Sequence, residues 1–266
     1  MKLSVVKVGG NIIDNQEALH AFLKQFNALE GPKLLVHGGG KIASELGKEM
    51  GITPNMVNGR RVTDKATLDL VTMVYGGLIN KNLVAVLQAM GCNAIGLTGA
   101  DGNTIQSVKR PVKEVDYGFV GDVQGVNAYL LQMYLKEGFV PVFAPLTHDL
   151  EGNMLNTNAD TVATEVAKAL AEVGYEVSLK YCFDKPGVML DLQDADSLVK
   201  ELTPVNYATL KEEGVIAEGM LPKLHNAFQA VEAGVEEVVL GLAEGILQQQ
   251  PFGTVVKAED KLAATS

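Results

Sequence analysis

Two short glycine-rich turns each end an apolar run of the chain, and both contain residue types that bind anions. They are residues 7–10 (KVGG) and residues 37–40 (HGGG), and the second is followed directly by a helical pattern. Glycine at the carboxyl end of a parallel strand lets the backbone approach a ligand closely, and a helix N-terminus offers free N–H groups. Glycine also tightens ordinary strand-to-helix turns. Because two such turns occur, and Lys7 lies in one of them, a polyanion site is favoured.

Three further polar clusters come directly before helical patterns. Residues 58–63 (NGRRVT) include Arg61, whose guanidinium suits bidentate binding of a carboxylate. Residues 156–160 (NTNAD) end in a carboxylate, and residues 219–223 (GMLPK) end in an ammonium group. Taken singly, each cluster also has a structural explanation, as a helix cap, a complement to the helix dipole or a solvated side chain.

Motifs for several other chemistries are not found in the sequence. Neither GxxxxGK[ST] nor a strand-linked GxGxxG occurs, which weakens the P-loop and dinucleotide-oxidoreductase interpretations. The four histidines do not have metal-ligand spacing, so no protein metal site is expected, and His37 is expected to pack beside the glycines. Cys92 and Cys182 are far apart and are interpreted as buried apolar residues.

The elements that must position these residues alternate along the chain. Runs rich in β-branched residues predict strands at 3–8, 34–36, 94–97, 140–144, 177–182, 235–240 and 254–256. Amphipathic stretches predict helices at 17–26, 42–50, 65–90, 126–137, 161–170 and 221–233. The alternation predicts an α/β fold, a three-layer αβα sandwich with a mainly parallel central sheet.

Two segments interrupt this alternation. Residues 107–122 and 146–155 have short alternating pieces around turn residues, and each predicts a β-hairpin beside the main sheet. The sequence contains no internal repeat and no flexible linker, so two continuous lobes are expected, residues 1–174 and residues 175–266.

Composition restricts the function further. The 266 residues are 47% hydrophobic, which is enough for a large core, and the net charge of -10 argues against a nucleic-acid surface. No stretch is expected to reach the roughly 20 apolar residues of a membrane span, and no signal-peptide pattern is recognised, so the expected location is cytoplasmic. An anionic small molecule would then be held locally, by backbone N–H groups and a few cations.

The ordered set of motifs resembles the amino-acid kinase family, and within it the enzymes that phosphorylate N-acetyl-L-glutamate. The five clusters occur in the family's order and span nearly the whole chain. The resemblance implies ATP-dependent phosphorylation of the side-chain carboxylate of N-acetyl-L-glutamate to an acyl phosphate, a step of arginine biosynthesis. Such a transfer needs no general base, because the carboxylate is already ionised.

The resemblance also implies a role for each matched residue. The acylated glutamate would be held by Gly39, Gly40, Arg61 and Asn156. Lys7 and Lys223 would flank the phosphoryl group, with Asp160 between them as the third catalytic residue. The nucleotide would contact Gly9, Gly10, Asp184, Lys185, Pro186, Gly187, Val188, Met189, Val215, Ile216 and Ala217. Mg²⁺ would be carried by ATP and not by a protein cage.

Assembly and alternative substrates follow from the same resemblance. The N-terminal lobe would bind the acylated glutamate and form a homodimer, and the C-terminal lobe would bind ATP. Arginine-inhibited members have a helix before the first strand, whereas this chain enters its first strand near Met1, so insensitivity to arginine is expected. Carrier-bound aminoadipate as the substrate, or a catalytically inactive ligand sensor, stays as an alternative.

Arg60 raises a third alternative, N-succinyl-L-glutamate. Its position is commonly apolar in the related kinases, and a second cation there suits an acyl chain that carries its own carboxylate. Neighbouring residues of an extended segment point to opposite sides, however, so Arg60 is expected to face solvent if Arg61 faces the ligand. N-acetyl-L-glutamate therefore remains the expected substrate.

Overall fold

The computed structural model describes residues 1–57, 60–191, 194–216, 220–248 and 252–258, and its centre is an eight-stranded sheet. The strands of this sheet are β1 (Lys2–Val8), β2 (Lys33–His37), β5 (Ala94–Leu97), β8 (Val140–Phe143), β11 (Glu176–Cys182), β12 (Glu201–Leu202), β13 (Glu237–Gly241) and β14 (Thr254–Val256). They lie in the order β12-β14-β13-β11-β1-β2-β8-β5. The β13–β14 pair is antiparallel and the other pairs are parallel.

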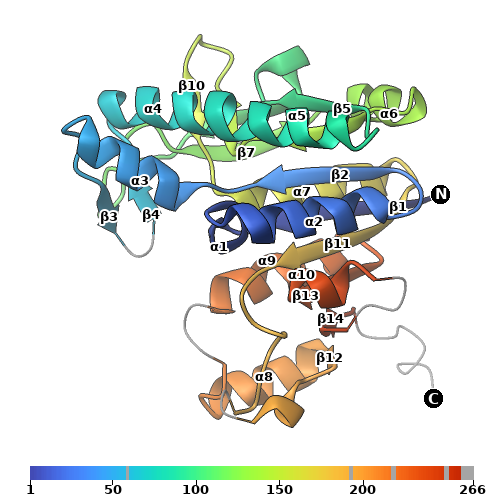
Figure 1. Ribbon diagram of the computed structural model, residues 1–266. Coiled ribbons are helices and arrows are strands. Elements are labelled where there is room, and N and C mark those ends of the chain that lie inside the picture. Colours follow the sequence, from blue (N-terminus) through green and yellow to red (C-terminus); the bar gives the residue numbers. More distant parts are fainter. Residues whose placement is uncertain (58–59, 192–193, 217–219, 249–251, 259–266) are drawn as a thin grey trace.

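Helices cover both faces of this sheet (Figure 1). One face is covered by α6 (Ala128–Lys136), α7 (Ala159–Glu172) and α9 (Leu221–Glu232). The helices that pack on the other face are α1 (Gly10–Ile13), α2 (Gln16–Ala28), α3 (Gly40–Glu49), α4 (Lys65–Val71), the π-helix η1 (Thr72–Ile79), α5 (Asn80–Ala89) and α10 (Ala243–Ile246). Two short 3₁₀ turns, η2 (Asp101–Asn103) and η3 (Ala195–Ser197), and helix α8 (Pro204–Glu212) complete the helical elements of the described residues. The predicted three-layer architecture is confirmed.

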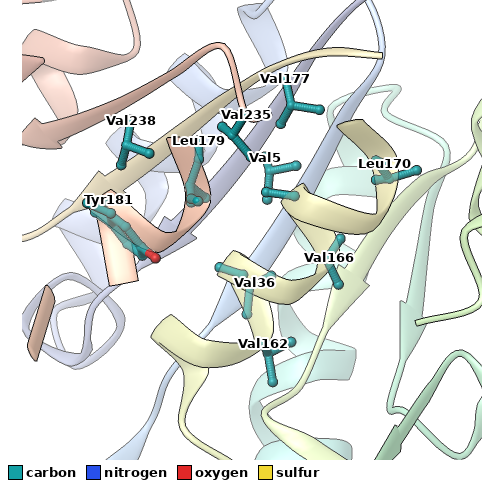
Figure 2. Packing of buried hydrophobic residues seen from close by; sticks show 14 of the residues in the cluster. Val5, Val36, Val162, Val166, Leu170, Val177, Leu179, Tyr181, Val235 and Val238 are labelled. Carbon is teal, nitrogen blue, oxygen red and sulfur yellow. The ribbon is translucent and has the colours of Figure 1, made fainter. Parts of the chain in front are cut away.

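The central strands are apolar on both sides because both sides are covered. In β1, Leu3 and Val5 belong to the core on the α7 face, whereas Val6 and Val8 belong to the opposite core. Figure 2 shows the first of these cores, in which Val162, Val166 and Leu170 of α7 lie against side chains of the sheet. Lys7 is the next β1 residue on the α7 face, which determines where its ammonium group points.

The two predicted hairpins are also confirmed, and they join into one smaller sheet. Its strands are β6 (Ile105–Lys109), β7 (Gly121–Val126), β9 (Leu146–His148) and β10 (Met154–Asn156), in the order β10-β9-β6-β7. A third hairpin pairs β3 (Asn55–Val57) with β4 (Arg60–Val62), beside α3 in Figure 1. Met56, Arg61, Gly121 and Asn156, which belong to strands of these smaller sheets, line one cavity together.

The helix predicted at 65–90 needs one correction concerning membranes. Within the described chain, Lys65–Ala89 is one helical segment of 25 residues, and its most apolar stretch of 18 residues has a mean hydropathy of 1.5, which by length and composition alone is enough to cross a membrane. The expectation that no stretch reaches this threshold is therefore wrong. Its buried side chains, among them Leu68, Val71 and Leu83, pack on the sheet, as those of a core helix do.

Candidate active site

Two lysines share one aspartate at the carboxyl end of the main sheet. Lys7 Nζ lies 2.8 Å from Asp160 Oδ1, and Lys223 Nζ donates a hydrogen bond of 2.7 Å to Asp160 Oδ2. The three side chains are largely buried, with exposed fractions of 10% for Lys7, 13% for Asp160 and 22% for Lys223. The structure thus brings together the three residues predicted to be catalytic, from positions as far apart as 7 and 223.

Local sequence explains this convergence. Lys7 follows the inward alternation of β1 toward α7, and Asp160 lies in the first turn of that helix. Asn158 caps α7, since its Oδ1 accepts hydrogen bonds from the backbone N–H groups of Asp160 and Thr161. Lys223 lies in the first turn of α9, beside Pro222, a residue that suits a helix start.

The electrostatic state of Asp160 follows from these partners. Burial, the largest influence, raises the pKa of Asp160, but the charges and hydrogen bonds of Lys7 and Lys223 outweigh it and lower the pKa to about 2. Asp160 is therefore ionised at neutral pH. Its single negative charge orients two ammonium groups, and the cluster keeps a net positive charge for an anionic ligand.

A cavity of about 190 Å³ lies beside the two lysines. It is lined by Lys7, Gly9, Gly10, Asn11, Ile12, Phe183, Asp184 and Lys223. The first glycine turn and the end of β11 meet here, because Gly9 N donates a hydrogen bond of 3.2 Å to Cys182 O. A small cavity lined by two ammonium groups and a partly buried glycine turn suits phosphate groups.

A second cavity, of about 240 Å³, lies beside the second glycine turn. We call it the acyl cavity, and it is lined by Gly38, Gly39, Gly40, Met56, Arg60, Arg61, Tyr75, Arg110, Val120, Gly121, Pro145, Asn156, Thr157, Asn158, Ala159 and Thr161. The two glycine turns are adjacent, since a Cβ added at Gly38 would lie 3.9 Å from Gly10 N. Ala159 and Thr161 flank Asp160, so the lysine pair lies close to both cavities.

All four residues predicted to bind the acylated glutamate line this cavity. Arg61 Nη2 donates hydrogen bonds to Gly40 O (2.9 Å) and to Ser44 Oγ (2.7 Å), which fixes the guanidinium at the start of α3. Asn156 Nδ2 donates to Thr63 Oγ1 at 3.0 Å. Polar groups held in this way are arranged in advance for a carboxylate or amide ligand.

The backbone at Gly39 requires glycine. Its φ is +147°, and an added Cβ would contact Ile79 Cδ1 and lie 3.3 Å from Tyr75 Cδ1. Both neighbours belong to the π-helix η1, an irregularity frequently found at functional sites. The close approach of η1 brings the Tyr75 ring to the acyl cavity.

His37 has the packing role expected for it. The side chain is fully buried; Nδ1 donates to Gly38 O at 2.8 Å, and Asn80 Nδ2 lies 3.2 Å from Nε2. Burial lowers its pKa to about 4, although the bond to Gly38 raises it and the charge of Lys81 adds to the lowering. The ring is therefore neutral at pH 7 and supports the glycine turn. Cys92 and Cys182 are buried free thiols, as expected.

The predicted nucleotide-binding residues of the C-terminal lobe fall into different environments. Asp184 lines the small cavity with Gly9 and Gly10, and Lys185 is exposed next to it. Val188, Met189 and Ile216 are buried, whereas Pro186 and Val215 are partly buried and Gly187 has a φ of +154°. Ala217 lies outside the described residues, as do Asn58, Gly59 and Gly219 of the sequence motifs.

Three residues at the acyl cavity were not predicted from sequence. Tyr75 and Arg110 line the cavity, and Ser44 accepts a hydrogen bond from Arg61. Tyr75 is part of an apolar helical pattern, and Ser44 looks like an ordinary polar residue of an amphipathic helix. Arg110 follows β6, and only the pairing of β6 with β7 brings it to the cavity. None of the three carries a local signal of binding.

Comparison with known proteins agrees with this geometry. The model of the amino acid kinase family matches residues 2–241. Acetylglutamate kinase from Phocaeicola vulgatus is 57% identical over 256 residues, which cover 96% of this chain and 98% of that protein. Acetylglutamate kinase from Bacteroides thetaiotaomicron is 56% identical with the same coverage of both chains.

A solved structure supports the fold independently. N-acetylglutamate synthase from Neisseria gonorrhoeae, complexed with coenzyme A and N-acetyl-glutamate, matches with a TM-score of 0.81 at 21% identity, over 97% of this chain and 60% of that one. Because the family model covers most of the chain and the kinase relatives are identical at more than half of the aligned positions, the chain belongs to the amino acid kinase family.

Proposed function

We propose that this protein transfers the γ-phosphoryl group of ATP to the side-chain carboxylate of N-acetyl-L-glutamate, giving an acyl phosphate and ADP, a step of arginine biosynthesis. The observation that carries this proposal is the pair of buried lysines on Asp160, next to one cavity suited to phosphate and another with a fixed arginine. The sequence identity of 57% and 56% to two acetylglutamate kinases supports N-acetyl-L-glutamate as the phosphoryl acceptor.

The chemistry needs positioning and charge stabilisation more than proton transfer. A carboxylate oxygen attacks the γ-phosphorus, and the bond to the leaving ADP oxygen breaks. Lys7 and Lys223 stabilise the negative charge on the transferring group, and Asp160 keeps both ammonium groups in place without taking a proton. In the acyl cavity, Arg61 binds the α-carboxylate, while Gly39, Gly40 and Asn156 position the remainder of the substrate.

The nucleotide site is proposed between the first glycine turn and the C-terminal lobe. Gly9 and Gly10 receive the phosphates, and the segments 184–189 and 215–217 hold the remainder of ATP. Two lysines beside a glycine turn, which lets phosphate groups approach closely, fit a triphosphate. The described residues contain no group of three acidic, histidine or cysteine side chains that could hold a metal ion, so we propose that Mg²⁺ enters bound to ATP, where it neutralises phosphate charge.

The two lobes, assembly and location complete the proposal. The lobe of residues 1–174 binds the acylated glutamate and forms a homodimer, and the lobe of residues 175–266 binds ATP. Met73 and Leu78 support such an interface, since both are about half exposed (53% and 47%) on the apolar segment Lys65–Ala89. Light scattering tests for the dimer. A cytoplasmic location fits a biosynthetic kinase that consumes ATP.

ADP release tests the function directly. The purified protein with Mg²⁺ and ATP is expected to release ADP only when N-acetyl-L-glutamate is added. Lys223→Ala should abolish most of that release, whereas Lys65→Ala, which changes an exposed lysine paired with Asp69, should retain it. Tight binding of N-acetyl-L-glutamate without ADP release would favour the inactive sensor and contradict the proposal.

A further inference from the structure

Arginines dominate one part of the acyl cavity. Arg60, Arg61 and Arg110 all line it, and among the described residues of its lining none is acidic. The proposed function uses Arg61 for the α-carboxylate, and the lysine pair lies where the side-chain carboxylate reacts. N-acetyl-L-glutamate has only these two carboxylates. Arg60 and Arg110 therefore have no anionic partner in that substrate.

Arg110 is held rigidly, with unused hydrogen-bonding capacity. Its Nε and Nη2 donate to Asp122 Oδ1 at 3.0 and 2.6 Å, and its guanidinium carbon lies 5.5 Å from the centre of the Tyr117 ring. The backbone is also fixed, because Arg110 N donates to Val120 O at 2.8 Å. Nη1, in contrast, is buried and has no hydrogen-bond partner within the described structure. A buried donor without a partner is costly, so a ligand oxygen at Nη1 would be favourable.

Arg60 and Arg110 are shared by the linings of two cavities, and we call the space beside these two arginines the passage. Both arginines line the acyl cavity, and both also line an adjoining cavity of about 570 Å³. The charged residues that line this outer cavity with them are Lys113, Glu114 and Asp122. Asp122 is already paired with Arg110, so the passage has an excess of positive charge. Arg60 is exposed, as expected. It nevertheless lines the acyl cavity together with Arg61.

An acetyl group cannot form hydrogen bonds with the two arginines of this passage through its methyl end. Its methyl end offers no acceptor, so it would partly desolvate two guanidinium groups without pairing them. An acyl chain that ends in a carboxylate can reach toward the outer cavity and accept hydrogen bonds from both arginines. We propose that Arg60 and Arg110 form a second carboxylate subsite, and that the kinase prefers N-acyl glutamates whose acyl group ends in a carboxylate, with N-succinyl-L-glutamate as the probe.

This inference rests on the proposed function and deepens it, and one set of kinetic measurements tests both. We would measure kcat/KM for N-succinyl- and N-acetyl-L-glutamate in the wild type, Arg60→Leu, Arg110→Leu and Lys109→Leu. Lys109 is the matched control, because it is exposed and lies over the Phe119 ring at 4.9 Å, outside the lining of the acyl cavity. The wild type and Lys109→Leu are expected to prefer the succinyl compound at least tenfold, as hydrogen bonds to a charged group allow.

Arg60→Leu and Arg110→Leu should each lose most of that preference. The loss should come from a lower kcat/KM for N-succinyl-L-glutamate, while kcat/KM for N-acetyl-L-glutamate is retained. Since Arg110→Leu leaves Asp122 unpaired, Arg60→Leu, a change at an exposed position, tests the subsite without that risk to folding. Calorimetric binding of N-succinyl-L-glutamate to each variant gives a second readout that does not need turnover. Equal or acetyl-favouring ratios in the wild type, or a succinyl preference unchanged in both variants, would overturn the subsite. If neither compound supports ADP release, the proposed function itself would be contradicted.

Discussion

Replacing Asp160 with asparagine removes the charge that two buried lysines share while keeping the shape of the side chain. The carboxyl group has a pKa of about 2 in the folded protein, against 3.8 for an unperturbed aspartate. Each pKa unit is worth about 1.36 kcal/mol, so ionisation of Asp160 stabilises the fold by roughly 2 to 3 kcal/mol at neutral pH. Asparagine resembles the protonated form, and Asp160→Asn is expected to lose about that amount.

The stabilisation by Asp160 should depend on pH in a characteristic way. The folded pKa is lower than the unfolded one, so the stabilisation is complete above pH 3.8 and is lost as the pH falls toward 2. The difference in free energy of unfolding between wild type and Asp160→Asn should therefore be constant from pH 7 to pH 5. At pH 3 it should be about half as large.

Urea unfolding followed by circular dichroism measures this difference. Asp69→Asn is the matched control, because Asp69 forms an exposed pair with Lys65 and should change stability by less than about 0.5 kcal/mol. Steady-state kinetics on the same proteins should show a lower kcat for Asp160→Asn, since the lysines lose their orienting partner. Wild-type stability at pH 7 together with wild-type kcat would refute the assignment of Asp160.

Four further predictions address single residues of the site. Lys223→Ala should lower kcat by roughly 100- to 1000-fold with little change in KM, in steady-state kinetics, because its ammonium acts mainly on the transition state; a rise in KM alone would move it out of catalysis. Arg61→Lys should weaken binding of the acylated glutamate by about 2 to 5 kcal/mol in calorimetry, since an ammonium cannot reproduce the guanidinium fork, and near-wild-type affinity would contradict its role. Gly39→Ala should cost about 1 to 3 kcal/mol of stability in urea unfolding, because its φ of +147° and the contact with Ile79 both exclude a side chain; an unchanged midpoint would argue against this close approach. His37 has a folded pKa of about 4, below its ordinary 6.5, so the free energy of unfolding should fall by up to about 3 kcal/mol from pH 6.5 to pH 4, and a slope that persists in His37→Gln would assign that loss to another group.

The main sheet could be predicted from sequence because its strands have a clear sequence pattern. All seven predicted strands occur in the eight-stranded sheet, since apolar, β-branched runs between amphipathic stretches suit strands covered on both faces. The missed eighth strand, β12, has two residues and no room for a pattern. Helix α8 was missed as well, and the structure gives the reason: none of its residues is buried, so its sequence carries no apolar stripe.

The site was predictable to a smaller extent. Strand alternation places Lys7 toward α7, but only the resemblance connected it with Asp160 and Lys223, because their proximity depends on how α7 and α9 pack on the sheet. Arg110 could not be found from sequence, since the register of β6 against β7 decides where it lies. Arg60 was expected to face solvent by alternation, and the structure adds that this exposed residue also lines two cavities.

Hydroxylamine trapping tests the central claim, that a carboxylate receives the phosphoryl group, most directly. An acyl phosphate reacts with hydroxylamine to give a hydroxamate, whereas a phosphate ester or free phosphate does not. With ATP, Mg²⁺ and N-acetyl-L-glutamate, the protein is expected to produce one hydroxamate for each ADP, and Lys223→Ala should lose both products together. Release of ADP without hydroxamate would contradict the account, because the phosphoryl group would then have gone to water or to another acceptor.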